Sequence, residues 1–474
     1  MIKTHQKTAK TNAPIILYEL NEVPWRVFDW YIKQRPGSHM AELFKESGLY
    51  TTRTHDKGEL HPWSTWPSLH RGIYNTTHHI NFINQDLSCA EEFPPLWQTL
   101  TELGIRVGVF GSMQSWPVPV GSKYCFYIPD TFAQTPETQP KNYSAYQSIN
   151  LRQTRADGMV TQSVQFNSNM FTELATLPFI GVRFITFMQL TRHLINEKID
   201  ARYRSRRALM QAPLGFDVFL HAYKKKKPEF CTFFTNHVAG AMHRYWKYAF
   251  PEDFNTTLET DECIFKCGTL MAAMEIADSQ IGELMRLLKQ DRGQLIVATS
   301  MGQEAIDRGI YSGELRLMSS DRLMQSIGFK HPYRDMLAMQ PDFNFKFESP
   351  DNASEFIELA NCLRSPSGRD LWFSTVQEGC TVNMSMGIPD DAMRTGTLVI
   401  VDRSIKSKIL RHLPLDEVGI SYIDRDPGTG YHQPLGCLIW HGSQNYLNNN
   451  RLEIESIDVR KMILKEFASR ADLP

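Results

Sequence analysis

The stretch that decides the fold is residues 274–300, MEIADSQIGELMRLLKQDRGQLIVATS. Its apolar residues recur at spacings of three and four from Met274 to Leu288, which predicts a helix with one buried face. The short apolar run Gln294–Ser300 follows a glycine, and this pattern is typical of a buried strand. A helix that leads directly into a buried strand is the repeating unit of an α/β sheet.

The same unit recurs elsewhere in the chain. Residues 94–104 (PPLWQTLTELG) begin with proline and end with glycine, as helices often do, and they lead into the apolar run 106–111. Four further short apolar runs bounded by turn residues are strand candidates: Ile15–Leu20, Phe230–Thr235, Thr397–Asp402 and Cys437–Gly442. We therefore predict an α/β fold with a doubly wound, mostly parallel sheet.

Two long stretches interrupt this alternation. Residues 126–225 contain a connection rich in Pro, Thr and Gln and then helix-like sequence with arginine clusters, whereas residues 305–395 are irregular. We interpret both as cap insertions over the strand ends. The α/β core would then comprise residues 1–125, 226–304 and 396–474.

Composition excludes several classes of protein. The chain has 474 residues, of which 42% are hydrophobic and 22% charged, so it can bury a large core and is not disordered. Its 51 Lys and Arg balance 52 Asp and Glu, and we expect no nucleic-acid polymer as a partner. The basic N-terminus is not followed by an apolar signal region, and the eight cysteines lack paired spacing. We expect a cytoplasmic protein.

One apolar stretch, Leu174–Leu190 (LATLPFIGVRFITFMQL), bears on membrane contact. It is shorter than the roughly 20 residues that a spanning helix needs, and it contains Pro178 and Arg183. We do not predict a span. Two interpretations stay open, namely a buried or interfacial helix, and a surface that docks on the inner face of a membrane or on a lipid-linked substrate.

Polar side chains follow most of the predicted strands. The carboxyl ends of parallel strands share one edge of a sheet, so we expect these side chains to converge. Taken singly, Thr65 is also a plausible helix N-cap and His243 a packed core histidine. The residues concerned are Asn21, Glu22, Thr65, Ser68, His79, Asn236, His237, His243, Gln303, Glu304 and His432.

The order of these motifs resembles the alkaline phosphatase superfamily, especially its type I phosphodiesterase/nucleotide pyrophosphatase branch. The matching elements are Thr65-Trp-Pro67-Ser68, His243 with aromatic residues after it, an Asp278-led helix, and Gly430–Gly436 (GYHQPLG). The resemblance implies an alkaline phosphatase-like sheet, a Thr65 nucleophile and two zinc-like ions that bind the reacting phosphate.

The sequence departs from the family at its metal ligands. The first aspartate of the family is replaced by Asn21, and the aspartate before His243 by either Asn236 or Ala239. The Asp-His pair after the strand at 294–300 is replaced by Met301–Gly302. These residues supply a neutral oxygen or no hard ligand, so we predict that the second metal site is lost.

One divalent ion, zinc or manganese, is still predicted. The resemblance places it on His243 and His432, with Asn236, His237 or water completing the coordination. A metal-free site is the alternative.

Without the second ion, the Thr65 hydroxyl needs a general base to become nucleophilic. Glu22 and Glu304 are the predicted catalytic carboxylates for this step. The residues predicted to bind substrate are Asn21, Ser68, His79 and Gln303.

Three interpretations of function follow. The first is an enzyme of phosphoester or phosphodiester chemistry, a hydrolase or transferase acting on a phosphorylated small molecule such as a nucleotide-sugar or a lipid-linked phosphate. The second is an enzyme that uses the same cleft for other chemistry. The third is an inactive phosphatase-like protein that binds a sugar phosphate or a partner. Polar replacements at the strand ends favour an active protein, because a decayed pocket fills with apolar residues.

Overall fold

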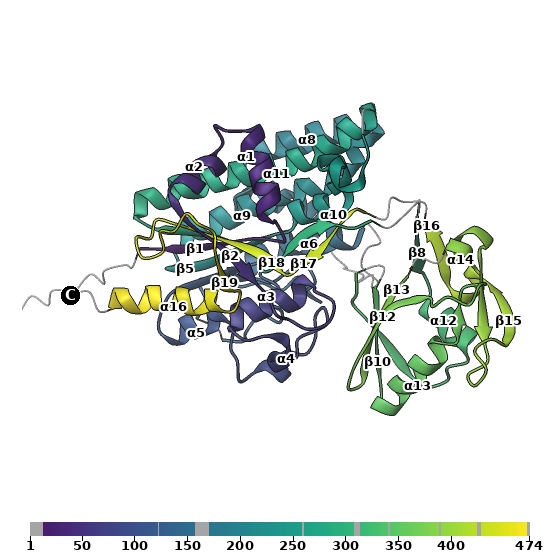
Figure 1. Ribbon diagram of the computed structural model, residues 1–474. Coiled ribbons are helices and arrows are strands. Elements are labelled where there is room, and N and C mark those ends of the chain that lie inside the picture. The colour runs from purple at the N-terminus through teal and green to yellow at the C-terminus, as the bar shows by residue number, and fades with distance from the viewer. Residues whose placement is uncertain are drawn as a thin grey trace, which may run out of the picture.

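The computed structural model describes residues 13–121, 123–156, 170–257, 260–307, 313–339, 342–387, 390–423 and 428–471. Two lobes are visible in Figure 1: a large one built on a central sheet, and a smaller one of mixed strands and helices.

The central sheet has eight strands in the order β19-β2-β18-β6-β1-β5-β3-β4. All of its pairings are parallel except the two that β18 makes with β2 and β6. The predicted α/β class with a mostly parallel sheet is confirmed. The strands are β1 (Ile15–Leu20), β2 (Ser47–Arg53), β3 (Val107–Phe110), β4 (Phe126–Ile128), β5 (Phe230–Thr235), β6 (Gln294–Ala298), β18 (Leu435–His441) and β19 (Leu452–Glu455).

Helices cover both faces of this sheet. Successive side chains of β1 alternate between two hydrophobic clusters: Ile16 and Tyr18 pack with α10 and α11, whereas Ile15 and Leu17 pack with α3, α5 and α16. The helices of the large lobe outside the first insertion are α1 (Trp25–Gln34), α2 (His39–Lys45), α3 (Pro62–Arg71), α4 (Asn75–His78), α5 (Leu96–Glu102), α10 (His237–Ala249), α11 (Asp261–Asp291) and α16 (Asp458–Ala471).

Helix α11 contains the predicted helix of residues 274–288 and extends it toward the N-terminus. Met274, Ala277, Ile281, Leu284 and Leu288 are all buried, as their spacing predicts. The helix begins after the N-cap Thr260 and ends before Arg292, which has a left-handed backbone and turns the chain into β6.

The first insertion forms α6 (Ser144–Ala156), α7 (Met170–Thr176), the 3₁₀ turn η3 (Leu177–Ile180), α8 (Phe184–Ile199), η4 (Ala201–Met210) and α9 (Gln211–Lys226). Helix α9 was expected in a cap, but it lies on the sheet: the ring of Phe219 is 4.7 Å from that of Phe233 on β5. Its apolar residues lie almost all round the helix, which is the pattern of a fully buried helix. The stretch 126–225 therefore begins with β4 of the central sheet and ends with a helix packed on that sheet, so only its middle part lies outside the core.

The apolar stretch 174–190 is divided among α7, η3 and α8 and does not form one buried helix. Gly181 separates η3 from α8 with φ +98°, and a Cβ atom there would lie 2.2 Å from His221. Among the described residues, no helix combines the length and apolarity needed to cross a bilayer.

The smaller lobe has its own hydrophobic cluster, from Leu315 to Ile420. The run Thr397–Asp402 forms β14 of this lobe and not a strand of the central sheet, so the boundary expected at residue 395 falls inside the lobe. A short buried run has the same pattern in either core, which explains the error. The elements are β8 (Glu314–Leu317), α12 (Ser320–Ile327), β9 (Tyr333–Met336), β10 (Asp342–Phe347), α13 (Pro350–Ala360), β11 (Leu363–Arg364), β12 (Trp372–Glu378), β13 (Thr381–Met386), α14 (Asp390–Thr395), β14 (Thr397–Val401), β15 (Ile409–Pro414), α15 (Leu415–Val418) and β16 (Ile420–Ile423).

Two short strands connect the lobes. β7 (Gly302–Ala305) leaves the large lobe just after β6, and β17 (Gly430–Gln433) returns to it just before β18. The two strands pair antiparallel, with Gln303 opposite His432. They lie at the carboxyl end of β6, and they carry three of the predicted site residues, Gln303, Glu304 and His432.

Candidate metal site and adjoining cavity

The site begins where β1 ends. Asn21 and Glu22 follow the strand directly, and both side chains are buried. Glu22 has φ +62°, a left-handed conformation that is uncommon for a residue with a side chain. Such a conformation costs free energy and persists only where surrounding contacts hold it. Here it aims the carboxylate at two histidines.

The carboxylate of Glu22 meets both of the predicted metal-binding histidines. Its Oε2 atom is 3.0 Å from His243 Nε2 on α10 and 3.5 Å from His432 Nε2 on β17. The three ligand atoms of this cluster all lie within 4.8 Å of one another. Two imidazole nitrogens and one carboxylate oxygen form the three-ligand set of many catalytic zinc sites, where the fourth position stays open.

The tautomer of His243 tests whether these residues fit a metal ion. Its Nδ1 atom is 2.9 Å from the carbonyl oxygen of Gly430 and must donate the proton there, because a carbonyl only accepts. The Nε2 atom that faces Glu22 then carries a lone pair in the neutral ring. A lone pair beside a carboxylate requires a cation between them, either a second proton or a metal ion. The donor set therefore fits a divalent ion.

Two amide side chains hold the Glu22 carboxylate in place. Gln303 donates to Oε2 of Glu22 and, over 3.2 Å, to the carbonyl of Ala239. Asn21 donates to Oε1 of Glu22 and to Oδ1 of Asn236, both over 2.7 Å. Such outer contacts orient metal ligands and tune their basicity.

Two buried polar atoms of the site have no partner in the part of the chain that the structure describes. They are Oε1 of Gln303 and Nδ1 of His432. Buried polar atoms are nearly always satisfied in folded proteins, so these two mark a place where a water or a ligand belongs.

Electrostatics keep Glu22 ionised. Burial alone raises the pKa of its carboxyl, but the charges of His432 and His243 and their hydrogen bonds outweigh burial and hold the pKa well below its usual range. An ionised carboxylate is the form that binds a cation.

His61, the residue before α3, extends the site toward the smaller lobe. Its ring meets that of His432 edge-on at 5.8 Å and stacks on Trp63 at 4.3 Å. Its Nε2 atom lies 3.9 Å from carboxylate oxygens of both Glu59 and Asp342, the latter from β10 of the smaller lobe. Burial and the nearby His432 lower the pKa of His61 to about 3, and burial raises that of Asp342 to about 7.

A cavity of about 290 Å³ adjoins His61. The large lobe contributes Lys57 and several polar side chains to its lining, and the smaller lobe contributes Ser374 and Asn383. Contacts across the cavity join the lobes: Asn81 donates to Glu378 over 2.9 Å. A space of this size suits a small molecule, and its polar lining suits a polar one.

The structure brings together five of the residues predicted from the sequence. His243 and His432 meet as predicted ligands, and Gln303 and Asn21 support them through Glu22. Glu22 itself was predicted as a general base, whereas its carboxylate lies between the two histidines.

Two predicted catalytic residues lie apart from this cluster. Thr65 is fully buried, and its hydroxyl is 2.7 Å from that of Ser300; the described contacts do not join it to His243 or His432. Glu304 is exposed, because alternation along β7 turns it away from the face that carries Gln303. Its predicted role as a base stays a prediction.

The ring of His237 has hydrogen-bond partners of its own, and its predicted ligand role stays a prediction. Its Nδ1 atom is 2.7 Å from the Thr235 hydroxyl and its Nε2 atom 3.0 Å from the Ala273 carbonyl, so both ring nitrogens are occupied. Asn236 contacts the cluster through Asn21, from which its Oδ1 accepts a hydrogen bond, and its predicted ligand role stays a prediction.

The two remaining predicted substrate-binding residues differ in position. Ser68 is buried, donates to Asp56 over 2.7 Å and lies 2.8 Å from His78 Nε2, so it has no surface for a substrate. His79 is exposed and lines the 290 Å³ cavity, 3.7 Å from Glu378.

Sequence reasoning missed His61 and Asp342. His61 opens the segment that contains Thr65, which is the signal that could have found it. Asp342 has no such signal, because only the fold brings it to His61.

Comparison with known proteins gives matches to solved structures alone. Neither the protein-family models nor the curated proteins give a match to the sequence. Solved structures do match along nearly the whole chain, and those described next are members of the alkaline phosphatase superfamily, the family that the motif order resembles.

Murine ectonucleotide pyrophosphatase/phosphodiesterase 5 is 11% identical, with 96% of this chain and 95% of that chain covered and a TM-score of 0.40. Phosphonoacetate hydrolase from Sinorhizobium meliloti 1021 is 11% identical, with 96% of each chain covered and a TM-score of 0.43. Alkaline phosphatase from the Antarctic bacterium TAB5 is 9% identical, with 96% and 97% covered and a TM-score of 0.38. At these values the inference of activity has to come from the site itself.

Proposed function

We propose that the protein is an enzyme of phosphoester or phosphodiester chemistry whose site holds one divalent metal ion on Glu22, His243 and His432. The observation that carries the proposal is the convergence of these three side chains, with Nε2 of His243 3.0 Å from the Glu22 carboxylate while Nδ1 is committed to Gly430. One divalent cation satisfies the carboxylate and both imidazoles together.

The residues around the cluster have separate tasks in this proposal. A bound divalent ion supplies Lewis-acid polarisation of a phosphoryl oxygen. Gln303 and Asn21 hold the Glu22 carboxylate in the orientation that binding requires. Burial of Glu22 and His432 keeps bulk water away from the ligands, which strengthens electrostatic interactions.

The substrate that we propose is a phosphorylated small molecule bound in the 290 Å³ cavity. Amide side chains of Asn75, Asn81 and Asn383 and the ammonium group of Lys57 line it, and such donors suit phosphate oxygens and sugar hydroxyls. A nucleotide-sugar or the head group of a lipid-linked phosphate has this chemistry. His61 lies between the cavity and the metal ligands.

Asp342 is the group in this region best suited to proton transfer. Its pKa of about 7 lies near neutral pH, where a general acid or base is most effective. Its carboxylate contacts His61 from the smaller lobe, so the proposed proton transfer depends on both lobes being in place.

Metal binding is the first test. Wild-type protein, purified without added metal and then loaded with zinc or manganese, is expected to hold one equivalent by elemental analysis. Glu22→Gln should lose it, because a neutral amide is a weak ligand for a dication. Glu304→Gln is the matched control, since it removes an exposed glutamate of the neighbouring strand. Absence of metal from the wild type, or retention by Glu22→Gln, contradicts the proposal.

Turnover is the second test. The metal-loaded protein should release nitrophenol from an aryl phosphodiester, and Glu22→Gln should not. The role of Thr65 as nucleophile stays a prediction, and Thr65→Val tests it: loss of turnover with metal retained supports that role. A protein that binds metal yet turns over neither phosphomonoesters nor phosphodiesters would match the other prediction, an inactive protein that binds a sugar phosphate.

A further inference from the structure

The first insertion exposes an apolar surface on α7, η3 and α8. Phe184 and Ile199, at the two ends of α8, are 77% and 79% exposed. We name this surface the cap face and define it by its exposed apolar residues, which are Phe171, Leu174, Phe179, Phe184, Ile185, Met188, Leu194, Ile195 and Ile199.

Helix α8 has its polar side inward, the reverse of a helix on the surface of a soluble protein. Its buried residues are Thr186, His193 and Glu197. Thr186 donates to Asp217 over 2.6 Å, and His193 Nε2 lies 2.8 Å from Glu197.

The opposite side of α8 is apolar. At 100° per residue, Phe184, Met188, Ile195 and Ile199 fall within about 60° of one another, roughly opposite the buried polar residues. All four are exposed. These apolar side chains therefore share one side of the helix, with the exposed Thr191 and Arg192 between Met188 and Ile195.

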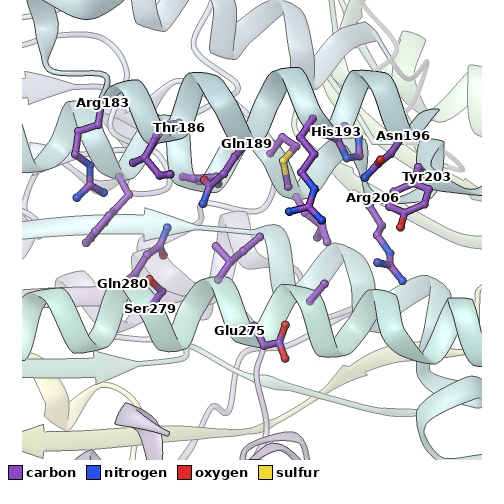
Figure 2. Close-up of a pocket in the computed structure, with 18 of the residues that line it drawn as sticks. Arg183, Thr186, Gln189, His193, Asn196, Tyr203, Arg206, Glu275, Ser279 and Gln280 are labelled. Atoms are coloured by element: carbon purple, nitrogen blue, oxygen red, sulfur yellow. The ribbon is translucent and has the colours of Figure 1, made fainter. Parts of the chain in front are cut away.

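A cavity beneath α8 accounts for this orientation. Thr186, Gln189, His193 and Asn196 of α8 line it on one side, as Figure 2 shows, and the cavity measures about 630 Å³. The opposite wall is α11, with Glu275, Ser279 and Gln280. Most polar residues of α8 thus line this cavity, together with Ile185 and Arg192, whereas Phe184, Met188, Ile195 and Ile199 are exposed and do not line it.

The charges around the cap face have one sign. The two acidic residues of α7 and α8, Glu173 and Glu197, are both buried and ion-paired, with Arg152 and Arg207 respectively. The exposed charged side chains of residues 170–199 are Arg183, Arg192 and Lys198. Arg183 pairs with Asp217 and Glu283, which leaves Arg192 and Lys198 to set the sign of the surface.

We propose that the cap face docks on an anionic lipid surface, with α8 lying in the membrane–water interface. Exposed apolar residues flanked by cations, with both acids of α7 and α8 buried, have the chemistry that binds anionic headgroups and the adjoining acyl chains. A second copy of this chain fits less well, because a two-fold contact would bring like charges at Arg192 and Lys198 together. The docking is independent of the chemistry at Glu22.

Vesicle flotation tests the proposal. Wild-type protein should float with vesicles of phosphatidylglycerol and phosphatidylcholine, and it should float less with phosphatidylcholine alone. High ionic strength should weaken its binding to the anionic vesicles. The triple variant Phe184→Ser/Ile195→Ser/Ile199→Ser should bind at least about tenfold more weakly, because it loses its apolar contact.

A matched control exists in the smaller lobe. Phe373, Ile405 and Ile409 are also exposed, at 70%, 55% and 44%, and their triple serine variant should bind like the wild type. If the cap variant fails to fold by circular dichroism, the charge reversal Arg192→Glu/Lys198→Glu provides the same test, with an expected loss of binding to the anionic vesicles.

Three results would overturn the inference. They are a wild type that does not float with anionic vesicles, equal binding by the cap variant and the smaller-lobe variant, and a wild-type dimer that the cap variant converts to a monomer without any vesicle binding. The last result would assign the cap face to a second copy. Metal content is expected to be unchanged in all of these variants, so failure of docking leaves the proposed function standing.

Discussion

His237 has either a structural role or a metal-binding role, and the substitution His237→Gln distinguishes the two. Burial lowers the pKa of His237 to about 4 from its usual 6.5, only partly opposed by its hydrogen bond to the Ala273 carbonyl. The folded protein therefore keeps the ring neutral at pH values where the unfolded chain takes up a proton.

The sign and size of the effect follow from this difference. Between pH 6.5 and 4 the unfolded state binds more protons, so the free energy of unfolding falls as the pH falls, and the loss levels off below the folded pKa. A difference of that size corresponds to about 3 kcal/mol at pH 4, from 1.36 kcal/mol per pKa unit. Above pH 6.5 the titration of His237 no longer changes the free energy of unfolding.

The assay is urea unfolding of the metal-free protein at pH 7.5 and pH 4.5, followed by tryptophan fluorescence. Eight of the nine tryptophans lie outside residues 314–423, so the signal reports mainly on the large lobe. His61 and His78 also lower the free energy of unfolding as the pH falls, because burial lowers both of their pKa values to about 3. The relevant quantity is therefore the loss of free energy of unfolding between pH 7.5 and pH 4.5 in the wild type minus the same loss in His237→Gln. We expect this difference to reach about 2–3 kcal/mol.

Two results would refute this reasoning. Equal pH dependence in the wild type and the variant would show that His237 is not held neutral by the fold. Loss of bound metal in His237→Gln would restore the ligand role that the sequence predicts.

Two further substitutions test the contacts around the site. Gln303→Leu removes a hydrogen-bond donor from the Glu22 carboxylate and should weaken zinc binding about 10–100-fold in a competition titration. Unchanged zinc affinity would show that this hydrogen bond does not contribute to metal binding. Ser68→Ala should lower the free energy of unfolding by about 1–3 kcal/mol and leave turnover intact, because it deprives a buried carboxylate of its hydroxyl donor. Lost turnover with stability preserved would instead favour the substrate-binding role predicted for Ser68.

Much of the fold follows from local pattern. The run Ile15–Leu20 forms β1 with the same limits, and the helix predicted over residues 274–288 lies within α11, because burial on one or both faces imposes a period that the sequence displays. Thr397–Asp402 shows where this reasoning ends. Hydrophobic pattern reports burial, but it does not report which of two cores a strand joins.

The sequence predicts those site residues whose location depends only on their position after a strand. His243 and His432 converge because their strands and helices share one edge of the sheet. The role of Glu22 could not be read in this way, since it depends on a left-handed backbone that places the side chain between two imidazoles. The surroundings of His237 and Glu304 could not be read for the same reason, because hydrogen bonds and strand alternation decide where a side chain points.

The path of the chain into and out of the smaller lobe has a consequence for how this molecule can vary. Ala305 of β7 and Gly430 of β17 are register partners, so the lobe is attached through two neighbouring points on one two-stranded ribbon. An insertion whose ends touch can be lengthened, shortened or replaced by a tight turn without altering the path of the remaining chain. Residues on the ribbon, His432 among them, stay in register whatever module lies beyond it. Substitutions beyond the ribbon thus reshape the wall facing His61 while leaving the proposed ligands Glu22, His243 and His432 in place.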